Sequence, residues 1–362
     1  MRKVEGKAQT MRPKKTRREN ELPYIHLGPF QWRIPGVHFH IEYVEFFQGL
    51  ILGATALSSI PYLTDYLGLP YELSWSCVIL EVFMYMFHGW LGDPVVPGWI
   101  TPTLPFTLAF LEGFEQGAER IQAMIAVQLL VACIFLFMGI TKLADKFISL
   151  VPASVKGGIL LAAPITVIQG QLEEGSQFMT APVATLAGTL LLAFLSFSPF
   201  CEKKRGKIKI LDIMVRYGNL FPYLAAMFVG VIVGELAKPM LEIGSLIRIP
   251  DFGDMFHTVS VFAVGFPPVH MFVKAFPLAF ICYVLAFGDF VTSETLVAEA
   301  KESRDDEYID FNSSRSNLLS GLRNLVLAIF APFPPLAGPL WAGMTVSVAM
   351  RYKEGKKAMK SL

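Results

Sequence analysis

Apolar residues recur in long stretches along this chain, and charged residues are concentrated in the segments between them. Because a helix needs about 20 mostly apolar residues to cross the hydrocarbon of a bilayer, stretches without Asp, Glu, Lys or Arg predict membrane helices. Five such stretches are clear, at residues 46–64, 121–141, 175–201, 217–234 and 324–350. Weaker ones, interrupted by prolines or by one or two charges, lie at about 70–90, 94–111, 151–172 and 270–295.

The stretch at 324–350 is too long for one crossing and contains four prolines, so we divide it into segments at about 316–331 and 335–350. The pattern therefore predicts an all-α polytopic membrane protein with about ten membrane segments. Lys and Arg should concentrate in cytoplasmic loops, and they do so after the fourth, sixth and tenth segments if the N-terminus is cytoplasmic. We expect a multi-pass protein of the inner or plasma membrane.

Composition supports this prediction. Hydrophobic residues make up 53% of the chain and charged residues 17%, whereas soluble domains have about 25% charged residues. The four cysteines are scattered without metal-ligand spacing, so no metal or other cofactor is expected. A phosphate-binding GxxxxGK[ST] loop and a Ser/His/Asp cluster are both missing from the sequence. We therefore expect that the chain is not an enzyme and does not bind nucleic acid.

Two proline-rich segments interrupt the apolar pattern, DPVVPGWITPTLPF at residues 93–106 and APFPPLAGPLWAG at residues 331–343. A proline inside a helix costs about 3 kcal/mol, so neither segment can be one continuous helix. They lie about 240 residues apart, and the first and eighth segments begin with a similar offset. Paired interruptions in two halves of a chain indicate a transporter binding site. The alternative is a re-entrant loop without function.

The offset predicts two repeats, each with an interrupted third helix. The expected regions are a basic cytoplasmic arm at 1–36, a first repeat of about seven segments at 37–240, an extracellular loop at 241–269, segments eight to ten of the second repeat at 270–350, and a basic cytoplasmic tail at 351–362. A second repeat of equal length would extend beyond residue 362, so we expect it to be incomplete, or the repeat hypothesis to be wrong.

Several motifs resemble the uracil permease-fold transporter superfamily, which includes nucleobase permeases, SulP sulfate permeases and molybdate transporters. The sequence LVPASVKGGILLAAPITVIQGQL at 150–172 resembles their fifth span, AFGDF at 286–290 the Gly-Asp of the eighth, GLRNLV at 321–326 the start of the ninth, and residues 334–343 the proline-rich start of the tenth. The resemblance covers about a third of the chain. It implies an inverted repeat of seven plus seven spans, with a mobile core domain and a gate domain.

Two departures from the nucleobase branch bear on the substrate. Where those permeases have a Glu four residues before the eighth-span acid, this chain has Leu285, and where they have a second Glu at the tenth half-helix it has Pro339. Loss of both carboxylates favours an anion over a nucleobase.

Asp289 is the main candidate for ion coupling, because a carboxylate inside a membrane span costs about 2.5–3.5 kcal/mol and is functional by default. The alternative is an acid paired with Lys274 or with a backbone group for structure alone. Thr292 and Ser293 lie three and four residues later on the same face and could coordinate Na⁺ or solute, although small polar residues also join helices. Glu45, in the first span, completes the ion-coupling set.

The ends of the interrupted helices are the expected solute site, because helix N-termini carry unpaired N–H groups and favour anions. The substrate-binding candidates are Gly98, Trp99, Ile100, Thr101, Thr103, Leu336, Ala337, Gly338, Leu340 and Gln48. Trp99 could equally anchor the chain at the membrane interface. Gln48 resembles a first-span Gln of the nucleobase branch. Glu81 and His88 share a face of the second span and suit either a proton relay or, preferably, bonds between helices.

These observations predict a secondary active transporter, coupled to H⁺ or Na⁺, for a small anion or weakly acidic solute such as sulfate, molybdate or an organic anion. One alternative is a nucleobase permease of the xanthine or uracil type. Alternatives of another class are an anion channel and a membrane scaffold that transports nothing. The expected partners are the small anion, the coupling cation and the lipid bilayer, and a homodimer is left open.

Overall fold

The computed structural model describes residues 18–172, 176–238 and 248–362 and is mostly helical. Within these residues, each of the ten expected membrane segments overlaps a helix. In the described part of the chain, three helical stretches are long and apolar enough to cross a membrane, Tyr43–Tyr66, Ala118–Thr141 and Val269–Glu302. A bent pair of helices, Lys209–Arg216 and Leu220–Val233, would make a fourth.

The helices follow the order of the apolar stretches. In the first part of the chain they are α1 (Tyr43–Ala56), η1 (Leu57–Ser59), η2 (Tyr62–Tyr66), α2 (Tyr71–Trp90), η3 (Thr101–Thr103), α3 (Leu104–Glu112), α4 (Ala118–Thr141), α5 (Leu143–Leu150) and α6 (Ala153–Gly170). Then come α7 (Gln177–Thr180), α8 (Pro182–Phe197), α9 (Pro199–Lys204), α10 (Lys209–Arg216), α11 (Leu220–Val233), α12 (Phe252–Val259), α13 (Val261–Val264), α14 (Val269–Glu302), α15 (Ser313–Phe330) and α16 (Ala342–Lys353).

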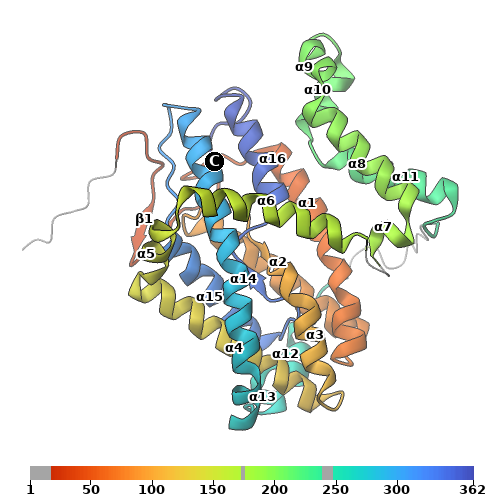
Figure 1. Ribbon diagram of the computed structural model, residues 1–362, viewed down its shortest axis with the longest axis vertical. Coiled ribbons are helices and arrows are strands. Elements are labelled where there is room, and N and C mark those ends of the chain that lie inside the picture. The colour runs from red at the N-terminus through yellow and green to blue at the C-terminus, as the bar shows by residue number, and fades with distance from the viewer. Residues whose placement is uncertain (1–17, 173–175, 239–247) are drawn as a thin grey trace, which may run out of the picture.

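Helices α4, α14 and α15 form a central bundle with α2 (Figure 1). Glycines allow α4 and α15 to approach closely, as small residues do between membrane helices. A Cβ on Gly139 of α4 would lie 2.8 Å from the carbonyl oxygen of Ser314, and one on Gly321 of α15 would lie 2.8 Å from the Leu136 side chain. The largest cluster of buried apolar side chains fills this bundle and continues into residues 331–337.

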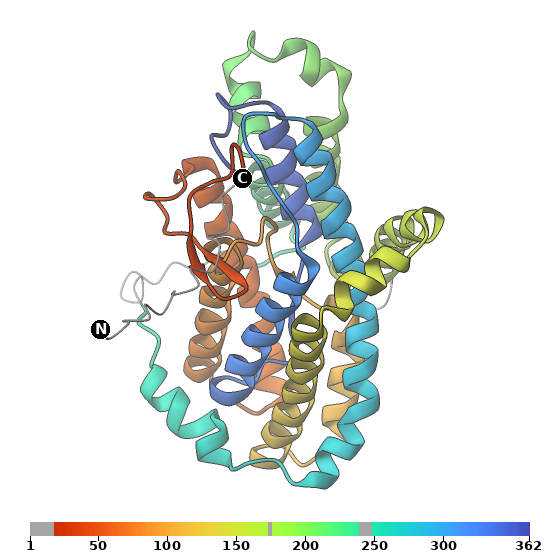
Figure 2. The ribbon, with the colours of Figure 1, turned by 90° about the vertical axis from the view of Figure 1, so that its left-hand side faces the viewer.

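The N-terminal arm contains a hairpin that the sequence pattern did not predict. Strands β1 (Ile25–Leu27) and β2 (Phe30–Trp32) form an antiparallel hairpin, with Ile25 opposite Trp32. Figure 2 shows this hairpin beside the loop that precedes α15. Asn20 and Tyr308 join the two segments, because the Tyr308 N–H donates to the Asn20 carbonyl at 2.8 Å. Residues 1–17 of the predicted arm lie outside the described residues.

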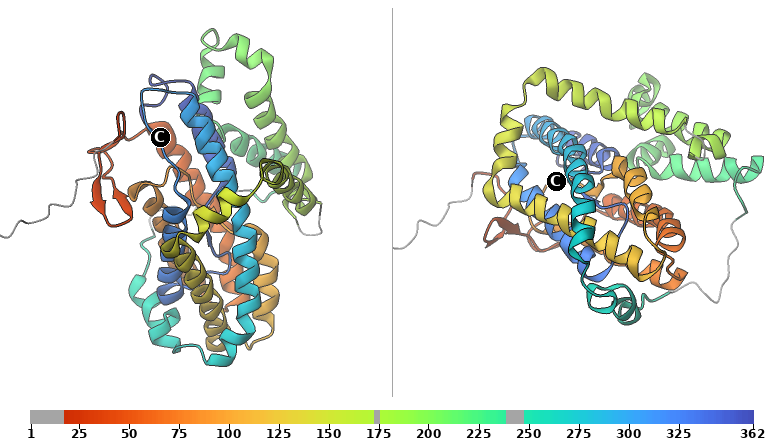
Figure 3. Two further views of the ribbon diagram at one scale, coloured as in Figure 1. Left: turned by 60° about the vertical axis from the view of Figure 1, so that its left-hand side comes forward. Right: turned by 60° about the horizontal axis from the view of Figure 1, so that its bottom comes forward.

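Helices α8 to α11 form an arm that packs mainly on itself and stands apart from the central bundle (Figure 3). Close contact between α8 and α11 depends on glycine, because a Cβ on Gly188 would lie 3.0 Å from the Pro222 carbonyl oxygen. The arm is linked to α1 and α16 by a few contacts, among them Arg205 with Glu354 at 2.6 Å and the rings of Phe47 and Tyr217.

The expected extracellular loop at 241–269 is not wholly irregular. Residues 239–247 lie outside the described part, but α12 and α13 follow them. The Asp251 carboxylate accepts the N–H of Asp254 at 2.8 Å and caps the start of α12. Met255 and Val259 then pack into the main core. A helix of eight residues is too short to give a clear apolar pattern, so sequence reading missed it.

Glu307 lies in the loop between α14 and α15 and is almost fully buried. Its carboxylate oxygens accept the N–H of Leu362 at 3.3 Å. Burial raises the pKa of Glu307 to about 7, although the guanidinium of Arg304 opposes the shift. The carboxyl group is therefore protonated in the folded chain over a pH interval in which it would be ionised in the unfolded chain.

A protonated carboxyl with a raised pKa stabilises the fold below that pKa, and the stabilisation decreases as pH rises. Because of Glu307, the free energy of unfolding should therefore decrease as pH rises from about 4.5 to about 7. Above pH of about 7 its contribution should no longer change with pH. We expect the thermal midpoint of Glu307→Gln, measured by scanning fluorimetry in detergent, to fall less over this interval than that of the wild type. Asp305→Asn, at an exposed position in the same loop, should behave as wild type. Equal pH slopes for Glu307→Gln and wild type would contradict this assignment.

Candidate functional site

The two proline-rich segments, about 240 residues apart in the chain, meet in the interior of the structure. Strand β3 (Gly98–Trp99) pairs antiparallel with strand β4 (Ala337–Gly338), with Gly98 opposite Gly338 and Trp99 opposite Ala337. Two further backbone bonds extend the contact, from the Ile100 N–H to the Leu336 carbonyl at 3.1 Å and from the Trp341 N–H to the Val96 carbonyl at 2.6 Å. We call residues 96–101 and 336–341 the strand crossing.

Glycine is required at the centre of the strand crossing, where the two backbones approach too closely for a side chain. A Cβ added to Gly98 would lie 2.8 Å from the carbonyl oxygen of Leu340. One added to Gly338 would lie 2.7 Å from the carbonyl carbon of Trp99 and 2.9 Å from the Ile100 nitrogen. Real Cβ atoms do not approach backbone atoms so closely, so either substitution would push the strands apart.

A short helix begins on each side of the strand crossing. Helix η3, continued by α3, starts at Thr101, and α16 starts at Ala342. Since the strands are antiparallel, the two helices run away from each other and their N-termini face the crossing from opposite sides. Neither η3 nor α16 has a side-chain cap. Thr101 and Ala342 are exposed, so the positive ends of two helix dipoles face solvent beside the crossing. At η3, Pro102 has no N–H and the Thr103 N–H donates to the Ile100 carbonyl at 2.9 Å.

A buried arginine holds the two strands together from behind. Arg323 of α15 has no exposed surface, and its guanidinium donates from Nη1 to the Gly338 carbonyl at 2.8 Å and from Nη2 to the Gly98 carbonyl at 3.4 Å. Nη2 also donates to the Glu81 carboxylate of α2 at 2.9 Å, and Glu81 is equally buried. The guanidinium lies 4.8 Å from the ring centre of Tyr85. One side chain thus joins α2, α15 and both strands.

Two buried amides fix β4 further. The Asn324 side chain accepts the N–H of Ala337 at 3.0 Å and donates to the Ala337 carbonyl at 2.7 Å. Gln128 of α4 accepts the N–H of Phe333 at 3.0 Å and donates to Asn324 at 3.4 Å. Because an unpaired buried amide would cost about 1–3 kcal/mol, these reciprocal bonds strongly favour one position of the strand.

Helix α14 packs against η3, α3 and α16, the helices that follow the two strands of the crossing. Its Cys282 thiol is a hydrogen-bond partner of the Thr103 hydroxyl. Asp289 follows seven residues later, on the same face and about 10 Å further along the helix. It is half-buried, and its carboxylate has no hydrogen-bond or ion-pair partner among the side chains that the structure describes.

The pairing of Asp289 with Lys274 does not occur. The two residues lie 15 positions apart on one helix, which separates them by about 22 Å, and the Lys274 ammonium lies over the Phe114 ring. The hydroxyls of Thr292 and Ser293 donate to the helix carbonyls of Gly288 at 2.9 Å and Asp289 at 2.7 Å. Their oxygens keep lone pairs that can still accept a bond or bind a cation.

Glu45, an expected ion-coupling residue, pairs with an arginine from the end of the chain. Its carboxylate is hydrogen-bonded to the Arg351 guanidinium of α16, and Glu42 lies 3.6 Å from the same group. An acid in the first turn of a span can pair with any cation that the fold brings near it, which the sequence does not reveal. Arg351 follows Glu45 by more than 300 residues.

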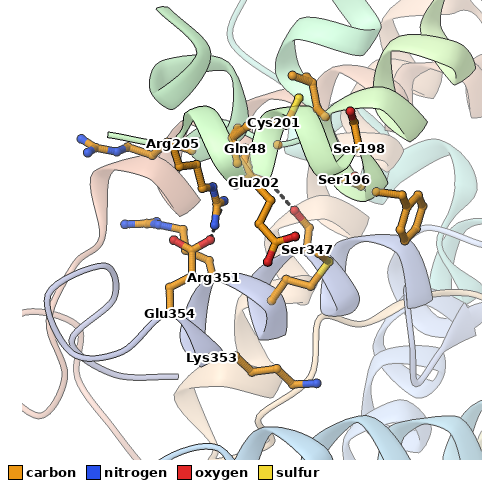
Figure 4. A pocket seen from close by; sticks show the side chains of 16 residues that line it. Gln48, Ser196, Ser198, Cys201, Glu202, Arg205, Ser347, Arg351, Lys353 and Glu354 are labelled. Carbon is orange, nitrogen blue, oxygen red and sulfur yellow. Dashed lines mark hydrogen bonds and ion pairs between the residues drawn. The ribbon is translucent and has the colours of Figure 1, made fainter. Parts of the chain in front are cut away.

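Gln48 lies beside a second feature, a cavity of about 390 Å³ between α1, α16 and the arm of α8 to α11. The Ser347 hydroxyl donates to the Gln48 amide oxygen at 3.3 Å, and Figure 4 shows this bond at the wall of the cavity with Glu202 and Arg205 on the facing side. Ser347 lies about 7.5 Å along α16 from its first residue. The cavity is therefore a neighbour of the strand crossing and not part of it.

Sequence reading did not single out Arg323 or Gln128. Arg323 lies inside the ninth segment predicted at 316–331, immediately before the charge-free stretch at 324–350. The rule that charges inside spans are functional or paired would have drawn attention to it once the ninth segment was placed at 316–331. The preferred use of Glu81 as a bond between helices is confirmed. His88 instead pairs with nearby Asp93 at 2.9 Å.

Comparisons with known proteins add no family assignment. No known family matches the chain in a search of protein families, and no curated protein sequence matches it.

Proposed function

We propose that this chain is a secondary active transporter that binds a small anion or weakly acidic solute at the strand crossing and couples its movement to H⁺ or Na⁺. The observation that carries the proposal is the antiparallel pairing of β3 with β4, which directs two uncapped helix N-termini toward one place. Interrupted helices of this kind hold anionic groups at the midplane of known transporters.

The local electrostatics support an anionic solute. Each helix N-terminus carries the equivalent of about half a positive charge, and two of them meet here. Arg323 and Glu81 behind the strands form a neutral pair. Among the residues that the structure describes, Asp289 on α14 is the unpartnered carboxylate that we place near the site. An anion is therefore favoured at the crossing once the charge of Asp289 is neutralised.

Asp289 then supplies a reason for coupling. An ionised carboxylate beside the site repels an anion, whereas a protonated or Na⁺-bound carboxylate does not. Binding of the cation to Asp289 and binding of the anion to the helix ends must therefore strengthen each other, and thermodynamic linkage makes the effect reciprocal. Thr292 and Ser293 lie one turn away and offer hydroxyl oxygens to a Na⁺ ion.

Uptake by liposomes containing the purified chain tests the proposal. Labelled sulfate, molybdate, bicarbonate, a dicarboxylate, uracil and xanthine are offered with an inward H⁺ gradient, an inward Na⁺ gradient or neither. We expect saturable uptake of at least one anion, accelerated by one of the two cation gradients. Uptake that follows only the gradient of the anion itself would indicate a channel. Uptake of uracil or xanthine alone would refute the anion preference. If none of these solutes is taken up, the alternative of a membrane scaffold that transports nothing is favoured.

Asp289→Asn tests the coupling role. The amide cannot be ionised, so cation-driven uptake is expected to fall at least ~10-fold, while exchange of labelled for unlabelled anion across the membrane persists. Glu302→Gln, at the exposed end of the same helix, is the matched control and should retain driven uptake. Wild-type acceleration by the cation gradient in Asp289→Asn would exclude Asp289 as the coupling residue.

A further inference from the structure

The tip of the helical arm combines a sharp bend with an unusual distribution of charge. Helix α10 is inclined by 97° to α11, the apolar helix that follows it. If α11 crosses the bilayer, α10 must lie nearly parallel to the membrane plane. Figure 1 shows α9 and α10 at the far end of α8, away from the central bundle.

Helix α10 has three distinct sides. Leu211, Met214 and Val215 pack toward Leu195 and Cys201 in a small core of their own. Lys209, Asp212 and Arg216 follow each other at helical spacing on the opposite side. Between these sides, Ile210 is 68% exposed and Ile213 46% exposed. This is the pattern of a helix that lies in the membrane interface, with apolar side chains toward the acyl chains.

The exposed apolar surface continues beyond α10. Phe197 at the end of α8 is 79% exposed and Phe200 in α9 is 51% exposed. Aromatic and branched apolar side chains at the bend would be costly in water but are suited to the boundary between headgroups and acyl chains.

Four lysines lie in the same segment as these apolar residues: Lys203, Lys204, Lys207 and Lys209, which we call the lysine cluster. All four are exposed, and none has an acidic partner among the residues that the structure describes. The nearby acid Asp212 is used locally, since its carboxylate accepts the Gly206 N–H at 2.8 Å. Uncompensated lysines on an interfacial helix attract anionic lipids.

We infer that the α9–α10 segment lies on the cytoplasmic leaflet and binds the phosphate headgroups of anionic lipids through the lysine cluster, with Ile210 and Ile213 inserted among the acyl chains. The inference requires that α11 crosses the membrane but does not depend on the proposed transport. An ion pair of 2.6 Å joins Arg205, inside the segment, to Glu354 at the end of α16 (Figure 4). Helix α16 begins next to the strand crossing, so this pair connects the lipid site to it.

Lipid titration of the purified full-length chain in a neutral detergent tests this inference. Dioctanoyl phosphatidylglycerol is expected to raise the thermal midpoint, because a ligand that binds only the folded chain stabilises it. Dioctanoyl phosphatidylcholine, with no net charge, should have little effect. Replacement of all four lysines of the cluster by Gln should weaken the apparent affinity for phosphatidylglycerol at least ~10-fold.

A matched control removes the same charge elsewhere on the predicted cytoplasmic side. The variant with Lys142, Lys146, Lys356 and Lys357 all replaced by Gln should respond to phosphatidylglycerol as the wild type does. An equal loss of response in this control would show a general charge effect, and an unaltered response of the cluster variant would show binding elsewhere. Either result overturns the inference, whether or not the chain transports anything.

Two further measurements distinguish a lipid headgroup from a free phosphate compound as the ligand. Glycerol phosphate at the same concentration should not raise the midpoint, because it lacks acyl chains. The Ile210→Gln/Ile213→Gln variant should bind phosphatidylglycerol more weakly than the wild type. If glycerol phosphate is as effective as the lipid and the two isoleucines are dispensable, the segment binds free phosphate compounds and the lipid assignment is wrong.

Discussion

Gly338→Val is expected to abolish anion uptake by the reconstituted protein while leaving the central bundle folded. A Cβ at this position would lie 2.7 Å from the Trp99 carbonyl carbon and 2.9 Å from the Ile100 nitrogen. Both are backbone atoms of the opposite strand, so they cannot rotate away as a side chain could. The strands must separate, and the Gly338 carbonyl would then lose its 2.8 Å bond from Arg323.

The expected size of this effect follows from the cost of overpacking, which is about 1–3 kcal/mol for a small insertion into a well-packed core. The same displacement moves the N-terminus of α16, and a shift of about 1 Å in a binding site can reduce its activity 100-fold. We therefore expect uptake to fall by about 100-fold or more for Gly338→Val and by a smaller factor for Gly338→Ala. Gly98→Ala should resemble Gly338→Ala, because its Cβ would lie 2.8 Å from the Leu340 carbonyl oxygen.

Gly89→Ala is the matched control, since Gly89 lies in α2 and a Cβ there would meet nothing within 4 Å. Uptake of whichever anion the reconstituted wild type transports is measured beside the elution volume in size exclusion. A variant that aggregates is uninformative about transport, which is why the smaller alanine substitutions are included. Wild-type uptake by both Gly98→Ala and Gly338→Ala would show that the strand crossing is not the solute site.

The positions of the helices could be predicted from the sequence because they depend on local pattern. The apolar stretches predicted helices where α4 and α14 lie. The prolines predicted the two helix interruptions, which contain β3 and β4. The pairing of the interruptions was an inference from their spacing, and the antiparallel contact of Gly98 with Gly338 is consistent with it. That all ten segments cross a membrane in two inverted repeats stays a prediction.

Contacts between distant residues could not be predicted in the same way. Glu45 looked like a coupling acid, but the fold places Arg351 against it. Gln48 was assigned to the solute site, but it lines the neighbouring cavity. Neither position differs in local pattern from a residue that does face the crossing. The bonds of Arg323 and Gln128 to the second proline-rich segment likewise exist only once α4 and α15 are packed together.

The second prediction concerns the ion pair of Glu81 with Arg323, in which both side chains are fully buried. Removing one partner of a buried ion pair leaves an uncompensated charge and costs about 3–5 kcal/mol. We expect Glu81→Gln to lower the thermal midpoint in detergent by ~5 °C or more. Arg323→Met should lower it further, because the carbonyls of Gly98 and Gly338 lose their donor as well.

A double substitution separates the ion pair from the bonds to the strands. Glu81→Gln/Arg323→Met contains no buried charge at this position, so its loss should be smaller than the sum of the two single losses. Glu299→Gln is the matched control, since Glu299 pairs with Lys353 at 3.0 Å but both are more than a third exposed. Pairs of that kind contribute about 0–1 kcal/mol, so its midpoint should hardly change.

The same variants show whether the ion pair of Glu81 with Arg323 positions the solute site or only stabilises the fold. Glu81 orients the guanidinium that donates to both strands. If it is a positioning residue, Glu81→Gln should raise the concentration of anion needed for half-maximal uptake even at temperatures well below its midpoint, because the two helix N-termini are no longer held in register. A lower midpoint with unchanged uptake would instead mean that Asn324 and Gln128 suffice to hold the crossing, since their bonds to residues 333 and 337 do not involve the ion pair.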